Sequence, residues 1–112
     1  MSMLSKREKR RYLALWNSNR FYDQNKMLET VRKRSSELFG QIATEKASIR
    51  VIGFEEGRNI IIMSCKLETL ENILSTIVFI EPPIVALGLS GTLKALRRRM
   101  RRGSQEFLRA FS

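Results

Sequence analysis

The chain has 112 residues, of which 43% are apolar, and 21 Lys and Arg against 11 Asp and Glu give a formal charge of +10. This length suits one domain, residues 1–112, with one core, and the excess of positive charge favours a polyanionic partner. The sequence contains no His and a single Cys, Cys65. An internal disulfide, a His-based nucleophile and a structural zinc site are therefore excluded.

The charge is concentrated at the two ends of the chain. Residues 1–50 carry a net charge of +7, residues 51–90 carry −3 and residues 91–112 carry +6. If folding brings the ends together, they form one positive surface. We expect residues 1–9 to be a basic, flexible tail. No apolar stretch has the length of a signal peptide core or a membrane span, so we expect a cytoplasmic protein with no membrane partner.

The first half of the chain predicts a strand followed by a helix. Residues 10–17 carry apolar side chains at both alternating sets of positions, which is typical of a central strand. Asp23 is a suitable N-cap for a helix that runs to Phe39 and stops at Gly40. The residues expected on its buried stripe are Met27, Leu28, Val31, Ser35, Leu38 and Phe39.

The second half predicts a hairpin, a helix and a further strand. Residues 47–54 and 59–66 are rich in β-branched residues and are separated by a short polar turn. Residues 67–78 have apolar side chains at helical spacing, and Pro82 and Pro83 end that helix. Residues 84–89 form the fourth predicted strand.

This order predicts an α+β fold, a ferredoxin-like or RRM-like split βαβ antiparallel sheet (β-α-β-β-α-β) with both helices on one face. A basic helical segment, residues 92–112, is added at the C-terminus, and Gly103 can kink it. The third strand is apolar on both sides, so the second sheet face needs a cover. The C-terminal helix or a partner protein could supply it, and the sequence leaves both open.

Basic residues cluster before the first strand and along the C-terminal segment. Arginine binds phosphate oxygens through two parallel N–H groups and suits folded RNA. The turn of residues 90–92 adds two hydroxyls that can cap the helix, next to free amides that can bind an anion. A solvated basic face and a membrane-surface helix are the alternatives. The predicted RNA-binding residues are Lys9, Arg10, Arg11, Ser90, Thr92, Lys94, Arg97, Arg98, Arg101 and Arg102.

Tyr12 and Trp16 share one side of the first strand and could stack on RNA bases. The third strand, however, has no aromatic residue between Asn59 and Cys65. We therefore favour core or interface roles for both side chains. Cys65, with apolar neighbours in the sequence, is expected to be buried.

Three segments resemble a known family. They are residues 11–15 (RYLAL), residues 37–40 (ELFG) and residues 87–94 (LGLSGTLK). Over residues 10–100 the chain resembles protein component 2 of archaeal-type ribonuclease P. The resemblance implies a non-catalytic, RNA-binding subunit of the ribonucleoprotein that removes the 5′ leader from precursor tRNA. It also implies that RNA and magnesium perform the hydrolysis, with no cofactor bound by the protein.

The partners implied by the resemblance are ribonuclease P RNA, precursor tRNA and protein component 3, in a heterodimer or heterotetramer. Two other classes of function stay open. A metal-dependent nuclease would use Glu55, Glu56 and Glu81 as ligands. A different ferredoxin-like RNA-binding protein, either ribosomal or a related ribonuclease P subunit, would share the basic ends.

Overall fold

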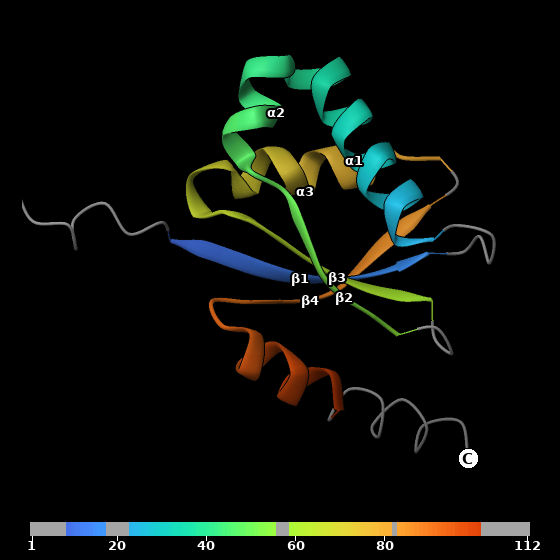
Figure 1. Ribbon diagram of the computed structural model, residues 1–112, viewed down its shortest axis with the longest axis vertical. Coiled ribbons are helices and arrows are strands. Elements are labelled where there is room, and N and C mark those ends of the chain that lie inside the picture. The colour runs from blue at the N-terminus through green and yellow to red at the C-terminus, as the bar shows by residue number, and fades with distance from the viewer. Residues whose placement is uncertain (1–8, 18–22, 56–58, 82, 102–112) are drawn as a thin grey trace, which may run out of the picture.

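A computed structural model of the chain describes residues 9–17, 23–55, 59–81 and 83–101. Its four strands form one antiparallel sheet in the order β2-β3-β1-β4 (Figure 1). The predicted α+β architecture, compatible with a ferredoxin-like split βαβ fold, is confirmed. The strands are β1 (Arg10–Asn17), β2 (Arg50–Glu55), β3 (Ile60–Lys66) and β4 (Ile84–Ser90).

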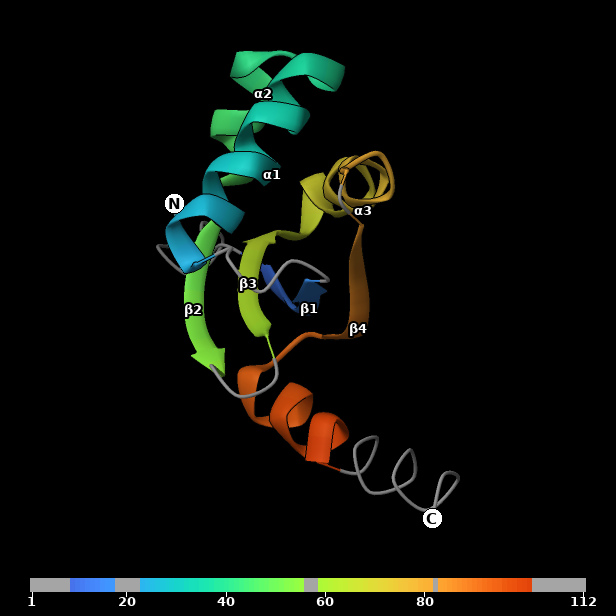
Figure 2. The ribbon, with the colours of Figure 1, turned by 90° about the vertical axis from the view of Figure 1, so that its right-hand side faces the viewer.

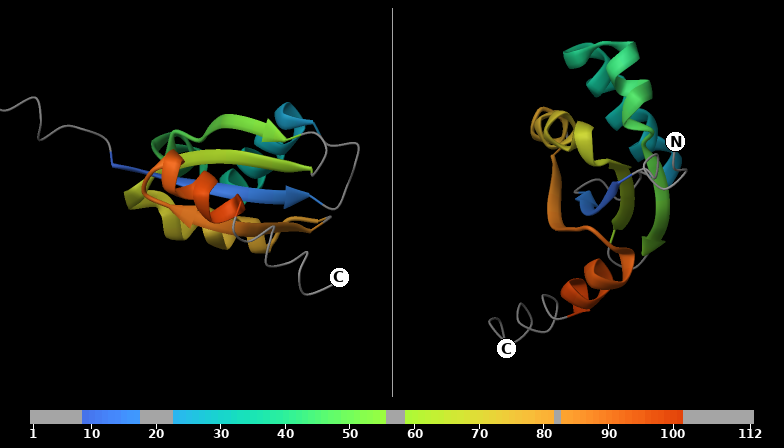
Figure 3. Two further views of the ribbon diagram at one scale, coloured as in Figure 1. Left: turned by 90° about the horizontal axis from the view of Figure 1, so that it is seen from below. Right: turned by 90° about the vertical axis from the view of Figure 1, so that its left-hand side faces the viewer.

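The helices lie on both faces of this sheet (Figures 2 and 3). On one face are α1 (Gln24–Phe39), α2 (Gln41–Ala47) and α3 (Leu70–Val78), and α3 is preceded by a 3₁₀ turn, η3 (Leu67–Thr69). On the opposite face lies a helix of residues 93–101, called the basic helix below. The rest of the predicted segment 92–112, with Gly103, and the predicted tail up to residue 8 lie outside the described residues.

The central strand β1 separates two apolar clusters. Leu13 and Leu15 point toward α1 and α3, where they join the main core with Ile61, Met63 and other fully buried residues. Ala14 faces the other way and joins a smaller cluster that includes Leu96 of the basic helix. Because successive strand residues alternate between faces, one apolar strand supplies both clusters. The predicted central, doubly apolar strand is confirmed.

Both predicted ends of α1 are confirmed. The Asp23 Oδ1 atom accepts a hydrogen bond from the Lys26 amide at 2.8 Å, which satisfies one free N–H of the first turn. Gly40, with φ of 93°, follows the last helical residue, and its amide donates to the Ser36 carbonyl at 2.9 Å. Such a positive φ favours glycine.

The structure corrects two predictions around this helix end. Residue 47 belongs to α2, not to a strand, and β2 begins only at Arg50. Leu38 and Phe39 were expected on the buried stripe of α1, but each is 39% exposed. Met27, Val31 and Ser35 are the buried residues of that stripe. The chain turns at Gly40 between α1 and α2, and Leu38 and Phe39 remain at the surface.

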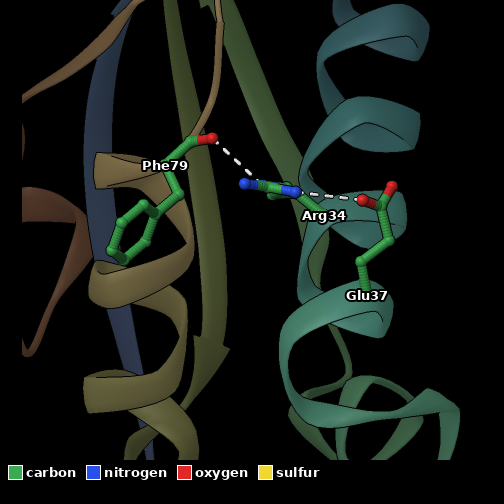
Figure 4. Close-up of polar contacts among 3 residues, drawn as sticks. All are labelled: Arg34, Glu37 and Phe79. Atoms are coloured by element: carbon green, nitrogen blue, oxygen red, sulfur yellow. Dashed lines mark hydrogen bonds and ion pairs between the residues drawn. The ribbon is translucent and has the colours of Figure 1, made fainter.

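Arg34 fixes α1 against the C-terminal end of α3 (Figure 4). Its Nε donates to the Phe79 carbonyl at 3.0 Å, and its Nη1 pairs with Glu37 Oε2 at 3.0 Å. The Phe79 carbonyl follows the last residue of α3, where helix carbonyls lack intrahelical partners. One guanidinium therefore satisfies an unpaired helix end and joins the two helices.

The remaining predicted elements agree with the structure, with small differences at their ends. The helix predicted over residues 67–78 starts as η3, and α3 ends at Val78, several residues before Pro83. The fourth strand extends one residue beyond the prediction, to Ser90. Within the described ranges, no helix combines the length and apolar character that crossing a membrane requires.

Candidate nucleic-acid interface

The basic helix is attached to the sheet by its apolar side. Leu96 is fully buried in the smaller cluster, together with Ala14, Ile60 and Ile62. Leu93 and Met100 lie three residues before and four after it and pack against the same cluster. Residues at this spacing share one side of a helix. The chain itself therefore covers the centre of the sheet face that the sequence left open.

Gly88 allows the helix to approach the sheet closely. A Cβ atom at this position would lie 3.1 Å from Leu96 Cδ1 and 3.6 Å from Met100 Sδ. The first distance is shorter than ordinary van der Waals contact between carbon atoms. A glycine in β4 thus makes room for the buried leucine.

This packing leaves the positive charges of the basic helix in solvent. Five cationic side chains occupy its nine positions, and all five are exposed. Within the described part of the chain, none of them has a carboxylate at ion-pairing distance. Their charge is therefore available to an external anion. They are Lys94, Arg97, Arg98, Arg99 and Arg101.

Two arginines of the helix lean toward opposite edges of the sheet. Arg99 Nη1 donates to the Leu89 carbonyl of β4 at 2.8 Å. Arg97 Nη2 lies 3.9 Å from the point that a Cβ on Gly53 of β2 would occupy. The positive charge therefore spreads across the width of the sheet instead of following a single line along the helix.

The turn before the basic helix acts as a cap. Thr92 Oγ1 accepts a hydrogen bond from the Ala95 amide at 3.1 Å, and Ser90 Oγ accepts one from the Thr92 amide at 3.4 Å. The predicted capping role is confirmed for Thr92, whereas the Ser90 hydroxyl closes the turn that precedes the helix. The anion site expected at the same amides stays a prediction.

The start of β1 lies beside this turn. Arg11 Nη1 is 3.4 Å from the point that a Cβ on Gly91 would occupy, so its guanidinium covers the first residue after β4. Lys9, just before β1, is exposed. Folding thus brings a cationic residue from the N-terminal end to the start of the C-terminal helix, as the charge distribution predicts.

Arg10 differs from the other predicted contact residues because its guanidinium is used inside the fold. Its Nε and Nη2 donate to Ser64 Oγ at 3.0 and 2.9 Å, and Nη2 also donates to the Ser48 carbonyl. These bonds join β1 to β3 and to the segment before β2. The last predicted contact residue, Arg102, lies outside the described residues.

The two aromatic side chains of β1 have different environments. Tyr12 is partly buried and packs against the cluster below the basic helix, in agreement with the predicted core role. Trp16 is 38% exposed, and its strand neighbour Val85 is 43% exposed. These two residues lie toward the end of the sheet that the described part of the basic helix does not cover.

The contacts of the basic helix argue against the membrane-surface alternative. A helix that binds a lipid surface inserts its apolar side into the bilayer. Here Leu96 is fully buried against β1 and β3, and Leu93 and Met100 flank it. The described apolar side of the helix is therefore used within the protein.

The nuclease alternative gains no support from the described residues. Glu81 is exposed, while Glu56 and the side chain of Glu55 lie outside the described part. Within that part, no three His, Cys, Asp or Glu residues gather as metal ligands would. Cys65 is fully buried, as predicted, and burial raises the pKa of its thiol, opposed by the Arg10 charge and a hydrogen bond with Thr69.

The sequence prediction missed one basic residue of the helix and one group of basic residues elsewhere. Arg99 belongs to the predicted arginine run but was not named as a contact residue. A groove between α1, α2 and β2 is lined by Arg32, Lys33 and Arg50. The run of basic residues in α1 was visible in the sequence. Its proximity to Arg50 depends on tertiary structure.

The sequence profile of the Rpp14/Pop5 family matches residues 3–101, which include every described strand and helix. The chain belongs to the Rpp14/Pop5 family. This is a family of ribonuclease P protein subunits, which take part in tRNA processing. The predicted relation to ribonuclease P is thus confirmed at the family level. No curated protein sequence matches the chain.

Proposed function

We propose that this Rpp14/Pop5 family member is the component 2 type of ribonuclease P subunit, which binds RNA without cleaving it. The RNA-binding surface consists of the exposed cations of the basic helix with Lys9 and Arg11. Thr92 supports this surface by capping the helix, and Ser90 by closing the turn before it. The bound RNA is ribonuclease P RNA, and the complex removes the 5′ leader from precursor tRNA.

The observation that carries the proposal is the two-sided character of the basic helix. One side is anchored by the fully buried Leu96, and the other exposes five cations without carboxylate partners in the described residues. An anchored helix holds the backbone positions of these residues at fixed spacing, so the helix itself needs no further ordering on binding. Each guanidinium can bind a phosphate through two parallel N–H groups.

The same surface favours backbone contacts over base recognition. Proteins that read single-stranded RNA stack bases on exposed aromatic side chains of an open sheet. Tyr12 is packed below the basic helix, and the same side of β3 carries Ile60, Ile62 and Ser64, none of them aromatic. The subunit therefore recognises the shape and charge of folded RNA and not a base sequence.

The catalytic metal belongs to the RNA in this proposal. Magnesium prefers carboxylate and phosphate oxygens in octahedral geometry. The described residues contain no group of three possible ligands, whereas the RNA partner supplies phosphates throughout. Cations of the protein lower phosphate repulsion and so reduce the magnesium that the RNA needs to fold.

Component 3 of ribonuclease P is the proposed protein partner. The apolar sheet face predicted from the sequence is covered at its centre, but Trp16 and Val85 remain about two-fifths exposed at one end. Tryptophan is among the residues enriched at the energetically dominant positions of protein interfaces. We place the partner contact at this end of the sheet.

The test of the RNA surface compares two charge-matched double variants. Arg98→Gln with Arg101→Gln removes two exposed cations of the basic helix, and Lys26→Gln with Lys46→Gln removes two exposed cations of α1 and α2. The measurement is the dependence of the ribonuclease P RNA dissociation constant on salt. The helix variant should reduce the log–log slope by up to about 1.4 to 1.8, that is 0.7 to 0.9 per lost phosphate contact. Equal slopes for both variants would exclude the proposed surface.

A further inference from the structure

A basic groove lies at the edge of the sheet, between α1, α2 and β2. It has a volume of about 620 Å³, and its lining residues come from α1, α2, β2 and the residues just before β2. Figures 1 and 2 show how these three elements are arranged. The strand order makes β2 an edge strand, so nothing in the described sheet pairs with its outer side. The residues that carry the argument are Arg32, Lys33 and Arg50, with Ser36, Glu45 and Ser48 around them.

Positive charge dominates this groove. Three cations line it against one carboxylate, Glu45, which accepts a hydrogen bond from Gln41 at 3.5 Å. Lys33 and Arg50 have no carboxylate at ion-pairing distance among the described residues. Cations gathered in a concave site concentrate their field and attract an anion more strongly than the same cations on a flat surface.

Arg32 is held in place at this groove by the fold. Its Nη2 donates to the Ile49 carbonyl at 3.1 Å, which takes one of the five N–H donors of the guanidinium. The preceding carbonyl, that of Ser48, accepts from Arg10, which also donates to Ser64 Oγ on β3. The two residues before β2 are therefore fixed by arginines from two different elements.

We propose that this groove binds a second segment of RNA backbone, so that the subunit connects two RNA segments. The inference rests on the proposed function, because it takes the RNA partner from there. The basic helix covers the sheet face opposite α1, whereas the groove lies on the α1 and α2 side. One continuous strand in contact with the basic helix does not also enter the groove unless it turns around the edge at β2.

The donors in the groove match a phosphate-ribose backbone. Its volume is within the range of about 300 to 1,000 Å³ that is typical of ligand sites, and it exceeds the space that one phosphate needs. Its lining contains guanidinium, ammonium and hydroxyl groups but no aromatic ring on which a base could stack. A phosphorylated segment of a partner protein would use the same donors, and the test must separate the two.

The experiment places a cleaving reagent at each surface. Cys65 is fully buried, so an iron–EDTA group attaches selectively to a new exposed cysteine. Glu45→Cys puts the reagent in the groove, Arg98→Cys puts it on the basic helix, and Glu71→Cys on α3 is the control. Each full-length protein is bound to ribonuclease P RNA, and the cut positions are mapped.

We expect cuts from position 45 in an RNA segment separate from the one cut from position 98, and no cuts above background from position 71. Cuts from position 98 alone would overturn the groove inference and leave the proposed function standing. No cuts from either position would contradict the proposed function itself. The two failures are therefore distinguishable.

Charge removal in the groove gives an independent measurement. Lys33→Gln with Arg50→Gln leaves the Arg32 hydrogen bond intact, and Lys26→Gln with Lys46→Gln is the charge-matched control outside the groove. The groove variant should lower the salt slope of RNA binding by up to about 1.4 to 1.8, and the control should not. An unchanged slope combined with weaker binding of component 3 would assign the groove to a protein partner and overturn the inference.

Discussion

At the scale of single residues, Gly88 is a position where the basic helix packs closely against the sheet. Gly88→Ala would place a Cβ 3.1 Å from Leu96 Cδ1, and Leu96 is fully buried and cannot move away freely. We expect a loss of about 1 to 3 kcal/mol in the free energy of unfolding, the usual cost of overpacking. Urea denaturation measures it.

Gly53→Ala is the matched control for this prediction. Its nearest neighbour would be Arg97 Nη2 at 3.9 Å, which is ordinary contact. Alanine at a compatible glycine position stabilises by about 0.4 to 1 kcal/mol by restricting the unfolded chain. If both variants changed stability equally, the short distance between position 88 and Leu96 would not be the cause of the destabilisation.

Cys65 provides a prediction of pH dependence. Burial raises the pKa of its thiol above the ordinary value of 9.0, against smaller opposing effects of Arg10 and Thr69. Above about pH 9 the thiol is therefore still protonated in the folded state but loses its proton in the unfolded state. The contribution of the thiol to the free energy of unfolding is complete below this pH and is lost as pH rises further. The stability difference between the natural chain and Cys65→Ala should shrink from pH 8 to pH 10 in urea denaturation. A stability difference independent of pH would contradict a raised thiol pKa in the folded protein.

The role of Arg10 shows why the sequence could not predict every RNA-contact residue correctly. The sequence placed it among the RNA contacts, because it lies in a run of basic residues. Its hydrogen-bond partners, Ser64 and Ser48, are 54 and 38 residues away in the chain. No local pattern distinguishes an arginine that will be used inside the fold from one that remains exposed.

At the scale of elements, Thr92 links helix capping to the proposed surface. Thr92→Ala removes the acceptor of the Ala95 amide and should lower the free energy of unfolding by about 0.5 to 2 kcal/mol. Asp23→Ala, which removes the cap of α1, is the control and should cost a similar amount. Because capping supports the RNA surface only indirectly, neither variant should change the salt slope of RNA binding. Weaker RNA binding by Thr92→Ala at an unchanged slope, with no such loss for Asp23→Ala, would instead make Thr92 a direct contact.

Most elements could be predicted because their signals are local. Strand β1 has its apolar pattern, and α1 has Asp23 and Gly40 at its two ends. Helix α2 was missed because Gly40 was treated as the end of helical structure, although residues 41–47 contain good helix formers. Because β-branched residues follow α2, the predicted strand also began too early, at residue 47 instead of Arg50.

The cover of the second sheet face could not be decided from the sequence. The spacing of Leu93, Leu96 and Met100 predicts an amphipathic helix, but the same spacing fits a helix that contacts another protein. The structure decides between them because Leu96 is buried against Ala14 and Ile62, which lie far from it in the sequence. The basic groove depends on three separate elements and has no sequence signal of its own.

At the scale of the whole molecule, positive charge occurs on both sides of one small sheet. The basic helix covers one face, and the groove lies beside α1 and α2 on the other. Two such surfaces on one small domain suit a protein that holds RNA segments together against their mutual repulsion. Because the chain belongs to the Rpp14/Pop5 family of ribonuclease P subunits, the RNA of ribonuclease P is the expected partner of these surfaces.

The most direct test is the rate of precursor-tRNA cleavage by the cognate ribonuclease P RNA as a function of magnesium, with and without this protein and component 3. The protein cations replace part of the magnesium that neutralises phosphate, so stimulation should be large at low magnesium and shrink as magnesium rises. The protein without RNA should cleave nothing. Cleavage by the protein alone, lost on changing Glu55 and Glu56, or an absence of stimulation at every magnesium concentration, would contradict the proposed role.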